Sequence, residues 1–407
     1  MYRSLLLFLC SLILFAEQID TFSLPINGTT LNQSCQIYLP YGKEDKKKTY
    51  PVLYILDGQY FFKNGVAIQN GLQITDVFPE MIVVGLTTTR DVRNQLYFSK
   101  RKAFTEFIEK QLIPYVETNY HASDDRLLFG WENGAFYSSY ILFEKSELFR
   151  CVISSNGAEL SEERIKNFAS KKLPFKPYFF FTNTDRDIYT YRFSESLYKA
   201  LKTHQPKNLH WTYKKRNDEY HGSLPIVALY DGLRYYYQNF PELEFRSIDE
   251  FNRMGGLNFL AQYYKERGSR FGFSQEISDG SKNNLIFIAW ITNNYPSFKF
   301  FMNEFKDVLQ TKRYASSYWQ NRLGQFYLKH KNSDKAIEFF KNGLEKYTVT
   351  PMLYNGLGKA YLLKKNMKAG LKYLEKAVTL GTQEKDGHLK TFISDLTEAR
   401  KRYTDLN

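Results

Sequence analysis

The sequence has few cysteines and no pattern of metal ligands. Only three cysteines occur in 407 residues, which excludes a small scaffold held together by disulfides. No Cys/His cluster has the spacing of zinc ligands, so no metal site is expected. Cys35 and Cys151 each lie in an apolar, strand-like stretch. We therefore expect both to be buried free thiols.

A long hydrophobic run is also missing. The apolar stretch Leu5 to Phe15 follows Arg3 and precedes Ala16. A run this short does not span a bilayer comfortably, whereas a charged start, a short apolar middle and a small residue at the end are typical of a signal peptide. We expect a signal peptide over residues 1–16 and a secreted or periplasmic protein with no stable membrane span after cleavage. An uncleaved membrane anchor is the alternative.

Acidic residues are outnumbered by basic ones. The chain has 56 Lys and Arg against 43 Asp and Glu, a net charge of +13. A basic excess can indicate a nucleic acid, an acidic substrate or an anionic membrane. No basic stripe is interleaved with aromatic residues, and the densest run, Lys46 to Lys48, lies in an apparent loop. The excess is interpreted as a solvated lysine-rich surface, with no nucleic-acid partner.

From about residue 34 to 240, short apolar runs alternate with longer amphipathic stretches. The runs predicted as strands are Cys35–Leu39, Pro51–Leu56, Met81–Leu86, Leu127–Phe129, Cys151–Ser154, Tyr178–Phe181 and His210–Tyr213. The stretches predicted as helices are Phe104–Thr118, Ala135–Glu144, Tyr191–Thr203 and Pro225–Phe240. This alternation predicts a mostly parallel sheet with helices on both faces. The polar loop between the first two runs predicts an antiparallel hairpin at the sheet edge.

Beyond about residue 250 the strand patterns stop and a repeat appears. Leu323, Gly324, Tyr327, Ala336 and Phe340 recur 34 residues later as Leu357, Gly358, Tyr361, Gly370 and Leu374. A period of 34 with small residues at fixed offsets is typical of tetratricopeptide repeats.

The expected domains after the signal peptide are an α/β domain over residues 26–242, a helical linker with a degenerate repeat over 250–312, and tetratricopeptide-like repeats with a cap helix over 315–403. The repeats either pack on the first domain or bind a protein or peptide partner.

One turn stands out because of what it lacks. Gly130, Glu132 and Gly134 form a Gly-x-Glu-x-Gly sequence between a predicted strand and a predicted helix. The nucleophile elbow of α/β-hydrolases is Gly-x-Ser-x-Gly in the same context. The glycines allow the strand and the helix to approach closely. Glu132 therefore occupies the nucleophile position, and the serine is absent.

A histidine and an acid are expected further along the chain, in the order nucleophile, acid, histidine. His221 follows the last predicted strand and precedes the last helix of the domain, where the general base belongs. Asp185 is the best candidate for the acid and Asp187 the next, because both follow the strand Tyr178–Phe181. The alternative is that these are solvated loop residues with no catalytic role.

Backbone donors could survive the loss of the serine side chain. The sequence Leu56-Asp-Gly-Gln follows a predicted buried strand. N–H groups at Gly58 and Gln59, together with that of Asn133 after the elbow, are the expected oxyanion hole.

These pieces together resemble the esterase D-like group of α/β-hydrolases, which includes the ferric-enterochelin esterase-like enzymes. The matching segments are 52–58, 82–86, Arg90-Asp91, 107–114, 126–130, 143–149, 221–225 and 230–233. The resemblance covers about residues 30–240, and some members of the group carry a tetratricopeptide tail. It implies an α/β-hydrolase fold, a Ser-His-acid carboxylesterase ancestry, a small ester-like ligand and no metal or organic cofactor. The sequence departs from the group at Glu132, where members have Ser, and at Ala135, where they usually have Gly.

Four functions follow from this departure. The domain could be catalytically silent as a serine esterase and serve in ligand or protein binding, since a glutamate cannot become an alkoxide. Glu132 could instead act as a carboxylate nucleophile with His221 as base, although its extra methylene relative to Asp displaces the attacking oxygen. A serine at 138, 139, 154 or 155 could replace the missing nucleophile. The repeats could also carry the function as an interaction domain.

The first function is the one that the sequence favours. On that interpretation we expect the Glu132 carboxylate to turn toward the oxyanion donors and pair with His221.

Overall fold

The structure is a computed structural model that describes residues 19–40, 48–159 and 161–404. It divides into two compact units, residues 1–241 and 242–407. The predicted signal peptide, residues 1–16, lies outside the described residues. Among the described helices, none is both long and apolar enough to cross a membrane.

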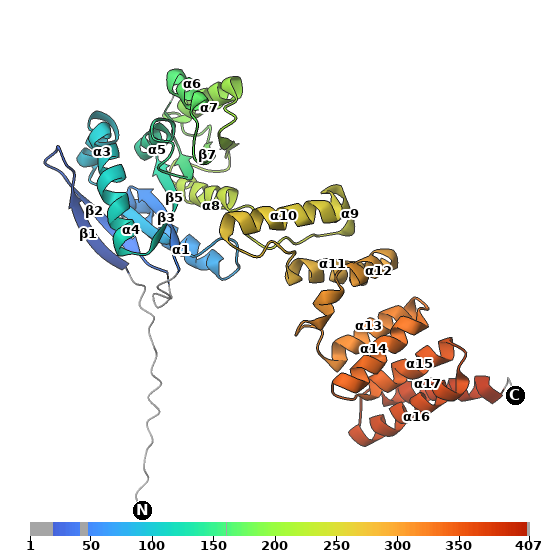
Figure 1. Cartoon of the computed structure of the whole chain (residues 1–407). Helices are drawn as coiled ribbons and strands as arrows, with labels where there is room; N and C mark the ends of the chain where they lie inside the picture. Colours follow the sequence, from blue (N-terminus) through green and yellow to red (C-terminus); the bar gives the residue numbers. More distant parts are fainter. Residues whose placement is uncertain (1–18, 41–47, 160, 405–407) are drawn as a thin grey trace, which may run out of the picture. The chain divides into compact units, whose positions relative to one another are not determined.

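The first unit is built on one eight-stranded sheet with the order β1-β2-β4-β3-β5-β6-β7-β8 (Figure 1). Its strands are β1 Ile19–Pro25, β2 Asn32–Tyr38, β3 Tyr50–Leu56, β4 Ile82–Thr87, β5 Ala122–Trp131, β6 Cys151–Ser155, β7 Tyr178–Asn183 and β8 His210–Lys215. Neighbouring strands in the part β4-β3-β5-β6-β7-β8 are parallel, whereas β2 is antiparallel to both β1 and β4. This is the mostly parallel sheet that the alternating pattern predicted.

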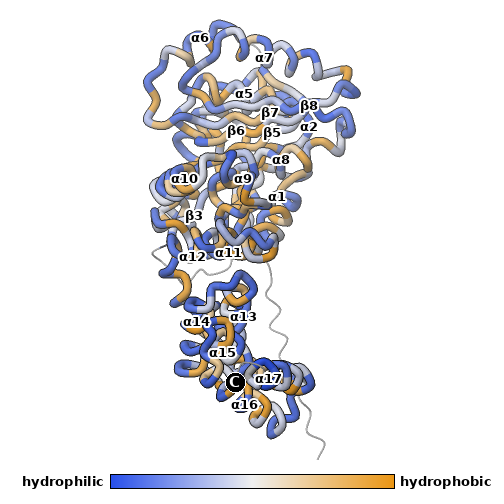
Figure 2. The backbone as a smooth tube through the Cα atoms, turned by 90° about the vertical axis from the view of Figure 1, so that its right-hand side faces the viewer, coloured by the Kyte–Doolittle hydropathy of each residue, from blue (hydrophilic) through white to orange (hydrophobic). Residues whose placement is uncertain are grey.

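Helices cover both faces of this sheet. They are α1 Gly58–Gln73, α2 Arg90–Asn94, η1 Gln95–Ser99, α3 Arg101–Phe107, η2 Ile108–Leu112, α4 Ile113–Asn119, α5 Asn133–Glu144, α6 Glu162–Ser170, α7 Tyr191–His204 and α8 Leu224–Tyr236. Figure 2 shows α5, α6 and α7 above strands β5 to β8, with α8 and α1 below them. Parallel strands covered in this way are buried on both faces, which explains why they appear in the sequence as continuous apolar runs.

All seven predicted strands and all four predicted helices of the first unit are present, although their ends differ by several residues. The predicted hairpin between the first two apolar runs is wrong. Strand β4 lies between β2 and β3 in the sheet, and β2 forms its hairpin with β1 instead. The sequence pattern missed β1 because its residues are exposed or half-buried, so they show little apolar character.

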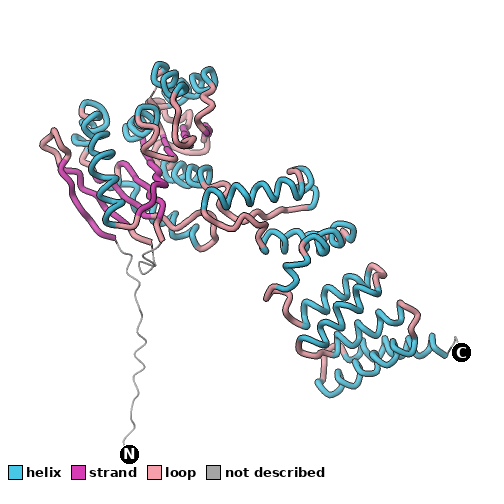
Figure 3. The backbone as a smooth tube through the Cα atoms, viewed as in Figure 1, coloured by secondary structure: helices cyan, strands magenta, loops and turns pink. Residues whose placement is uncertain are grey.

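The described part of the second unit is helical, as Figure 3 shows by colour. Its helices are α9 Ile248–Arg253, α10 Gly256–Phe271, α11 Asp279–Ile291, α12 Tyr295–Glu304, η3 Lys306–Gln310, α13 Ser317–Lys329, α14 Ser333–Lys346, α15 Pro351–Leu363, α16 Met367–Glu384 and α17 Leu389–Thr404. Helices α13 and α15 begin 34 residues apart, and so do α14 and α16. The sequence period therefore matches the spacing of two successive helix pairs.

Groups of buried residues hold the described part of the second unit together. A large one extends from Phe245 to Ala360. A small one contains Leu374, Leu396 and Ala399, from helices α16 and α17, and Leu362 of α15 packs against it. Within the repeat region, from α13 to α17, helices that are neighbours in sequence pack on each other. The chain is thus an α/β-hydrolase fold followed by an all-helical unit.

Candidate functional site

The turn between β5 and α5 places Glu132 in a strained backbone conformation. Its φ is +51° and its ψ is −113°, a combination that costs a side-chain-bearing residue on the order of 1–3 kcal/mol. Such a turn projects its central side chain away from the end of the strand, as the nucleophile elbow does. The Glu132 N–H donates to the Ser155 carbonyl at 2.9 Å, and its own carbonyl accepts the first helical bonds of α5.

Gly130 and Gly134 are required by close packing at this turn, as the sequence predicted. A Cβ atom on Gly130 would lie 2.2 Å from the carbonyl oxygen of Gly134, a backbone atom. A Cβ on Gly134 would lie 3.1 Å from Oδ2 of Asp57 and 3.4 Å from Cβ of Leu56. The first turn of α5 is therefore packed against the end of β3 and the start of α1.

Arg93 is the central charged group of the site, and the sequence did not identify it. Its Nη1 donates to Glu132 Oε2 at 2.8 Å, its Nε to Asp57 Oδ1 at 2.8 Å, and its Nη2 to the Trp131 carbonyl at 3.0 Å. Its side chain is only 10% exposed. The guanidinium also lies over the Trp131 ring, 5.3 Å from the ring centroid. These contacts fix the position of the Arg93 side chain and keep it paired with Glu132.

Asp57 is the buried anchor of this arginine. It adopts a left-handed conformation, with φ +57°, at the start of α1. Its Oδ1 accepts hydrogen bonds from Arg93, Thr88 and Tyr97. Burial raises the pKa of Asp57, although Arg93 and these hydrogen bonds oppose the rise. Its Oδ2 has no partner among the described residues.

The expected pairing of Glu132 with His221 is not what the structure shows. The Glu132 carboxylate pairs with Arg93 instead, and its side chain is 33% exposed. The pKa of His221 is raised mainly by its hydrogen bond with Asp187, and the charge on Glu132 adds to this rise. The Trp131 ring contacts the His221 ring, with 5.2 Å between their centroids. Trp131 therefore connects the Glu132–Arg93 pair to the histidine.

The structure places Asp187, and not Asp185, beside His221. Asp187 Oδ2 lies 2.8 Å from His221 Nδ1. Asp185 is 43% exposed and pairs with Lys215 at 3.5 Å. The preference for Asp185 as the acid is therefore wrong, and the second candidate takes its place.

Hydrogen bonding explains this outcome. Asp187 is fully buried and also accepts hydrogen bonds from Asn156 and Thr190. Burial alone would raise the pKa of Asp187, but the bonds from His221, Thr190 and Asn156 lower it well below its usual range. The same contact with Asp187 raises the pKa of His221, against the effect of burial. The pair can thus hold the imidazole in one tautomer and stabilise its charged form.

The predicted oxyanion residues lie at the first turns of two helices. Gly58 and Gln59 begin α1, and Asn133 begins α5. N–H groups in a first turn have no intrahelical acceptor and are free to bind a ligand. The Asp57 and Glu132 carbonyls accept hydrogen bonds from N–H groups further along α1 and α5, and not from those of Gly58, Gln59 and Asn133. The oxyanion role of the three residues stays a prediction.

The serines considered as replacement nucleophiles lie in the core. Ser138 and Ser154 are fully buried and hydrogen-bonded to each other at 2.8 Å. Ser139 donates to the Ala135 carbonyl at 2.8 Å, and Ser155 donates to the Asn156 side chain at 2.7 Å. Within the described residues, none of the four has a hydrogen bond with His221. Cys35 and Cys151 are both buried free thiols, as predicted.

Comparisons with known proteins agree with the fold of the first unit. Residues 28–184 match a family model described as "Putative esterase". The first unit has an α/β-hydrolase fold, and most of it is similar to this esterase family. An IroE-like serine hydrolase from Shewanella oneidensis has a similar structure, with a TM-score of 0.51 and 19% identity over 71% of this chain and 98% of that one.

An uncharacterised protein from Capnocytophaga ochracea aligns with a TM-score of 0.55 and 16% identity, over 94% of this chain and 100% of that one. At these identities the two structures show the fold alone. The comparison with curated proteins found no match. Among the described residues, no group of three or more His, Cys, Asp or Glu side chains is arranged to hold a metal ion.

Proposed function

We propose that the esterase-like domain has lost serine-esterase chemistry and holds a small ester-like ligand at its elbow without cleaving it. The observation that carries this proposal is the 2.8 Å contact between Arg93 Nη1 and Glu132 Oε2. A carboxylate has no proton to give to His221, so it cannot form the alkoxide of the serine mechanism. Its pairing with a guanidinium also lowers its own nucleophilicity.

The same contact opposes the alternative in which Glu132 attacks an ester directly. Carboxylate nucleophiles must be placed within about 3–3.5 Å of the reacting carbon. Arg93 holds one Glu132 oxygen, and Arg93 is itself held by Asp57 and the Trp131 carbonyl. Release of the carboxylate would leave a nearly buried guanidinium without one of its two ion-pair partners.

Features that would bind a ligand remain. His221 is 37% exposed and keeps its Nδ1 contact with Asp187, so in its charged form its Nε2–H can donate a hydrogen bond to a ligand oxygen. The first turns of α1 and α5 offer backbone N–H groups next to it in the proposed site. The export of the protein, predicted from residues outside the described range, would place this binding function outside the cytoplasm.

An ester-hydrolysis assay tests the proposal. The native protein, Glu132→Ser and Glu132→Ser/His221→Ala are compared on p-nitrophenyl acetate and butyrate, and each is treated with a fluorophosphonate probe for activated serines. We expect hydrolysis and labelling only with Glu132→Ser. The control Glu159→Gln changes a carboxylate outside the site, whose partners are Arg101 and Arg164, and it should behave like the native protein.

Hydrolysis by the native protein that disappears in His221→Ala would refute the proposal. If neither the native protein nor Glu132→Ser is active, the ligand-holding role stands. The remaining residues would then no longer be arranged for hydrolysis.

A second function is supported by the helical unit. The 34-residue offset of α13 and α15, and of α14 and α16, is that of tetratricopeptide repeats. We infer that this unit binds a protein or peptide partner. Binding of a partner from the same source to residues 242–407, and not to the esterase-like domain, is the expected result in a pull-down with the two parts expressed separately.

A further inference from the structure

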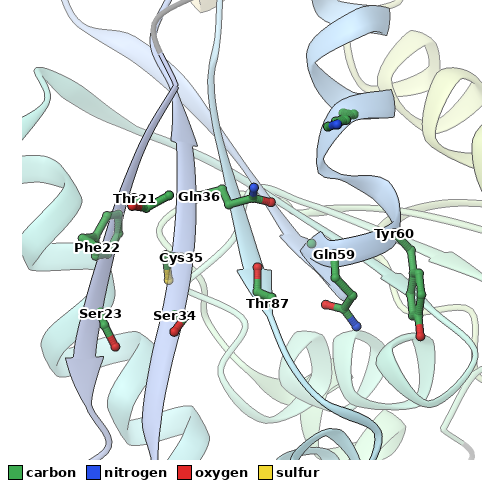
Figure 4. A pocket seen from close by; sticks show the side chains of 11 residues that line it. Thr21, Phe22, Ser23, Ser34, Cys35, Gln36, Gln59, Tyr60 and Thr87 are labelled. Atoms are coloured by element: carbon green, nitrogen blue, oxygen red, sulfur yellow. The ribbon is translucent and has the colours of Figure 1, made fainter.

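A groove of about 780 Å³ lies on the first unit beside the start of α1. Strands β1, β2 and β4 form its floor, and the first residues of α1 form one side (Figure 4). Gly58 and Gln59 belong to its lining, so the groove reaches the residues that we propose as the oxyanion hole.

The floor of the groove carries small hydroxyl and amide side chains in rows. Strand register places Thr21 opposite Gln36, Ser23 opposite Ser34, and Ser34 opposite Thr87. Figure 4 shows these side chains on one side of the three strands. Cross-strand neighbours lie about 5 Å apart, and residues two apart on a strand about 7 Å apart. Within the described residues, none of these five side chains has a hydrogen-bond partner.

The composition of the lining excludes most ligand classes. It contains no acidic residue, which argues against a cationic ligand, and a single basic one, Lys63, which is too little for a polyanion. Two of its apolar side chains are engaged elsewhere. The Phe22 ring packs on Tyr115, with 4.7 Å between ring centroids, and Cys35 is only 1% exposed. Hydroxyls and amides that both donate and accept fit a neutral ligand with many hydroxyl groups.

An exposed aromatic ring completes the lining. Tyr60 is 60% exposed, so its ring is open to stacking by a ligand. It contacts the Trp131 ring, with 6.2 Å between centroids, and Trp131 contacts His221 in turn. A second connection runs through hydrogen bonds, since Gln59 Oε1 accepts from the Thr88 N–H at 3.0 Å and Thr88 bonds to Asp57. The groove and the elbow are therefore linked by direct side-chain contacts.

We propose that this groove binds a neutral polyhydroxylated ligand, such as an oligosaccharide, with a sugar face on Tyr60 and hydroxyls on the Ser and Thr rows. The inference deepens the proposed function and rests on it, because it names the chemistry of the ligand whose ester group would reach the elbow. The simpler interpretation of these side chains, a solvated polar sheet face, predicts no saturable binding.

Isothermal titration calorimetry on the full chain tests this proposal. The probes are neutral pentose and hexose oligosaccharides of three to six units, with oligogalacturonate as an anionic comparison. We expect saturable binding of a neutral probe, and Tyr60→Ala should weaken it by at least about fivefold, the value of one aromatic contact. Ser34→Val, which replaces a central hydroxyl by an apolar group that suits a strand, should weaken it further.

The matched control is Tyr318→Ala, since Tyr318 is 58% exposed and lies in the helical unit. It should bind like the native protein. Thermal unfolding of each variant shows whether the fold is intact. Absence of binding to every neutral probe, equal binding by all variants, or tighter binding of oligogalacturonate would each overturn the proposal.

This outcome is separable from that of the proposed function, because the ester assay does not depend on sugar binding. Esterase activity gained by Glu132→Ser without any sugar binding would refute only the groove proposal. Sugar binding by a native protein that hydrolyses esters through His221 would refute only the claim of lost catalysis.

Discussion

Arg93 donates from Nη1 to Oε2 of Glu132 across 2.8 Å, so the carboxylate at the nucleophile position is paired with a side chain from helix α2. The arginine is bound on its other side by the buried Asp57. The elbow thus keeps its backbone geometry while its side chain belongs to an ion-pair network.

The first prediction concerns this network. Arg93→Met leaves the Asp57 carboxylate buried without its cation, and loss of one partner of a buried pair costs about 3–5 kcal/mol. We expect the free energy of unfolding in urea to fall by an amount of that order. Arg150→Met is the control, because Arg150 pairs with the 71% exposed Asp124 and should cost less than about 1 kcal/mol. Equal losses in the two variants would contradict the network.

The second prediction separates the two acids. Asp187→Asn removes the charge that raises the pKa of His221, so the histidine should titrate at lower pH in that variant. Asp185→Asn should leave the titration unchanged, because Asp185 pairs with Lys215. Both are followed by the NMR shift of the His221 ring protons. A fall in the pKa of His221 in Asp185→Asn alone would show that the acid has been misassigned.

The third prediction is a pH dependence of stability. The pKa of His221 is raised in the folded protein above its unfolded value of about 6.5. Its contribution is therefore fully present below about pH 6.5 and lost as the pH rises through the folded pKa. We expect the difference in unfolding free energy between the native protein and His221→Gln to be larger at pH 5.5 than at pH 9. A difference in unfolding free energy that increases with pH would contradict this prediction.

The fourth prediction compares two glycines. Gly130→Ala forces a Cβ to within 2.2 Å of a backbone oxygen, and overpacking of this kind costs about 1–3 kcal/mol or more. Gly71 lies within α1 with no heavy atom within 4 Å of the Cβ position. Gly71→Ala should therefore stabilise the protein by about 0.5–1 kcal/mol through better helix formation. Thermal unfolding of both variants measures the two effects, and a tolerated Gly130→Ala would be incompatible with the tight elbow.

The sequence predicted the elbow because its signal is local. Gly130, Glu132 and Gly134 lie within five residues, between a strand and a helix whose patterns are clear. His221 was predicted for a similar reason, by its place after the last strand. The acid was harder, because Asp185 and Asp187 lie in one loop and only the turn that follows decides which is buried. The Asp187 carboxylate accepts the N–H groups of Tyr189 and Thr190, a detail that composition does not reveal.

Arg93 could not have been found in this way. It lies 39 residues before Glu132, and arginine is mostly exposed in proteins, so nothing in its own segment indicates a buried site. The groove was missed for a related reason. Strand β1 is exposed along most of its length, and a strand whose outward face is polar and whose inward face is only half-buried shows little apolar alternation.

The small core of α16 and α17 has a consequence for how the chain opens. Leu362 of α15 packs against this core, and Asn355 of α15 donates to Asp395 of α17 at 2.8 Å. The last two helices are therefore joined to α15, and we expect all three to open as one unit. Amide hydrogens of α15, α16 and α17 should then exchange with solvent at similar rates, and a protease at low concentration should not release α16 and α17 while α15 stays intact.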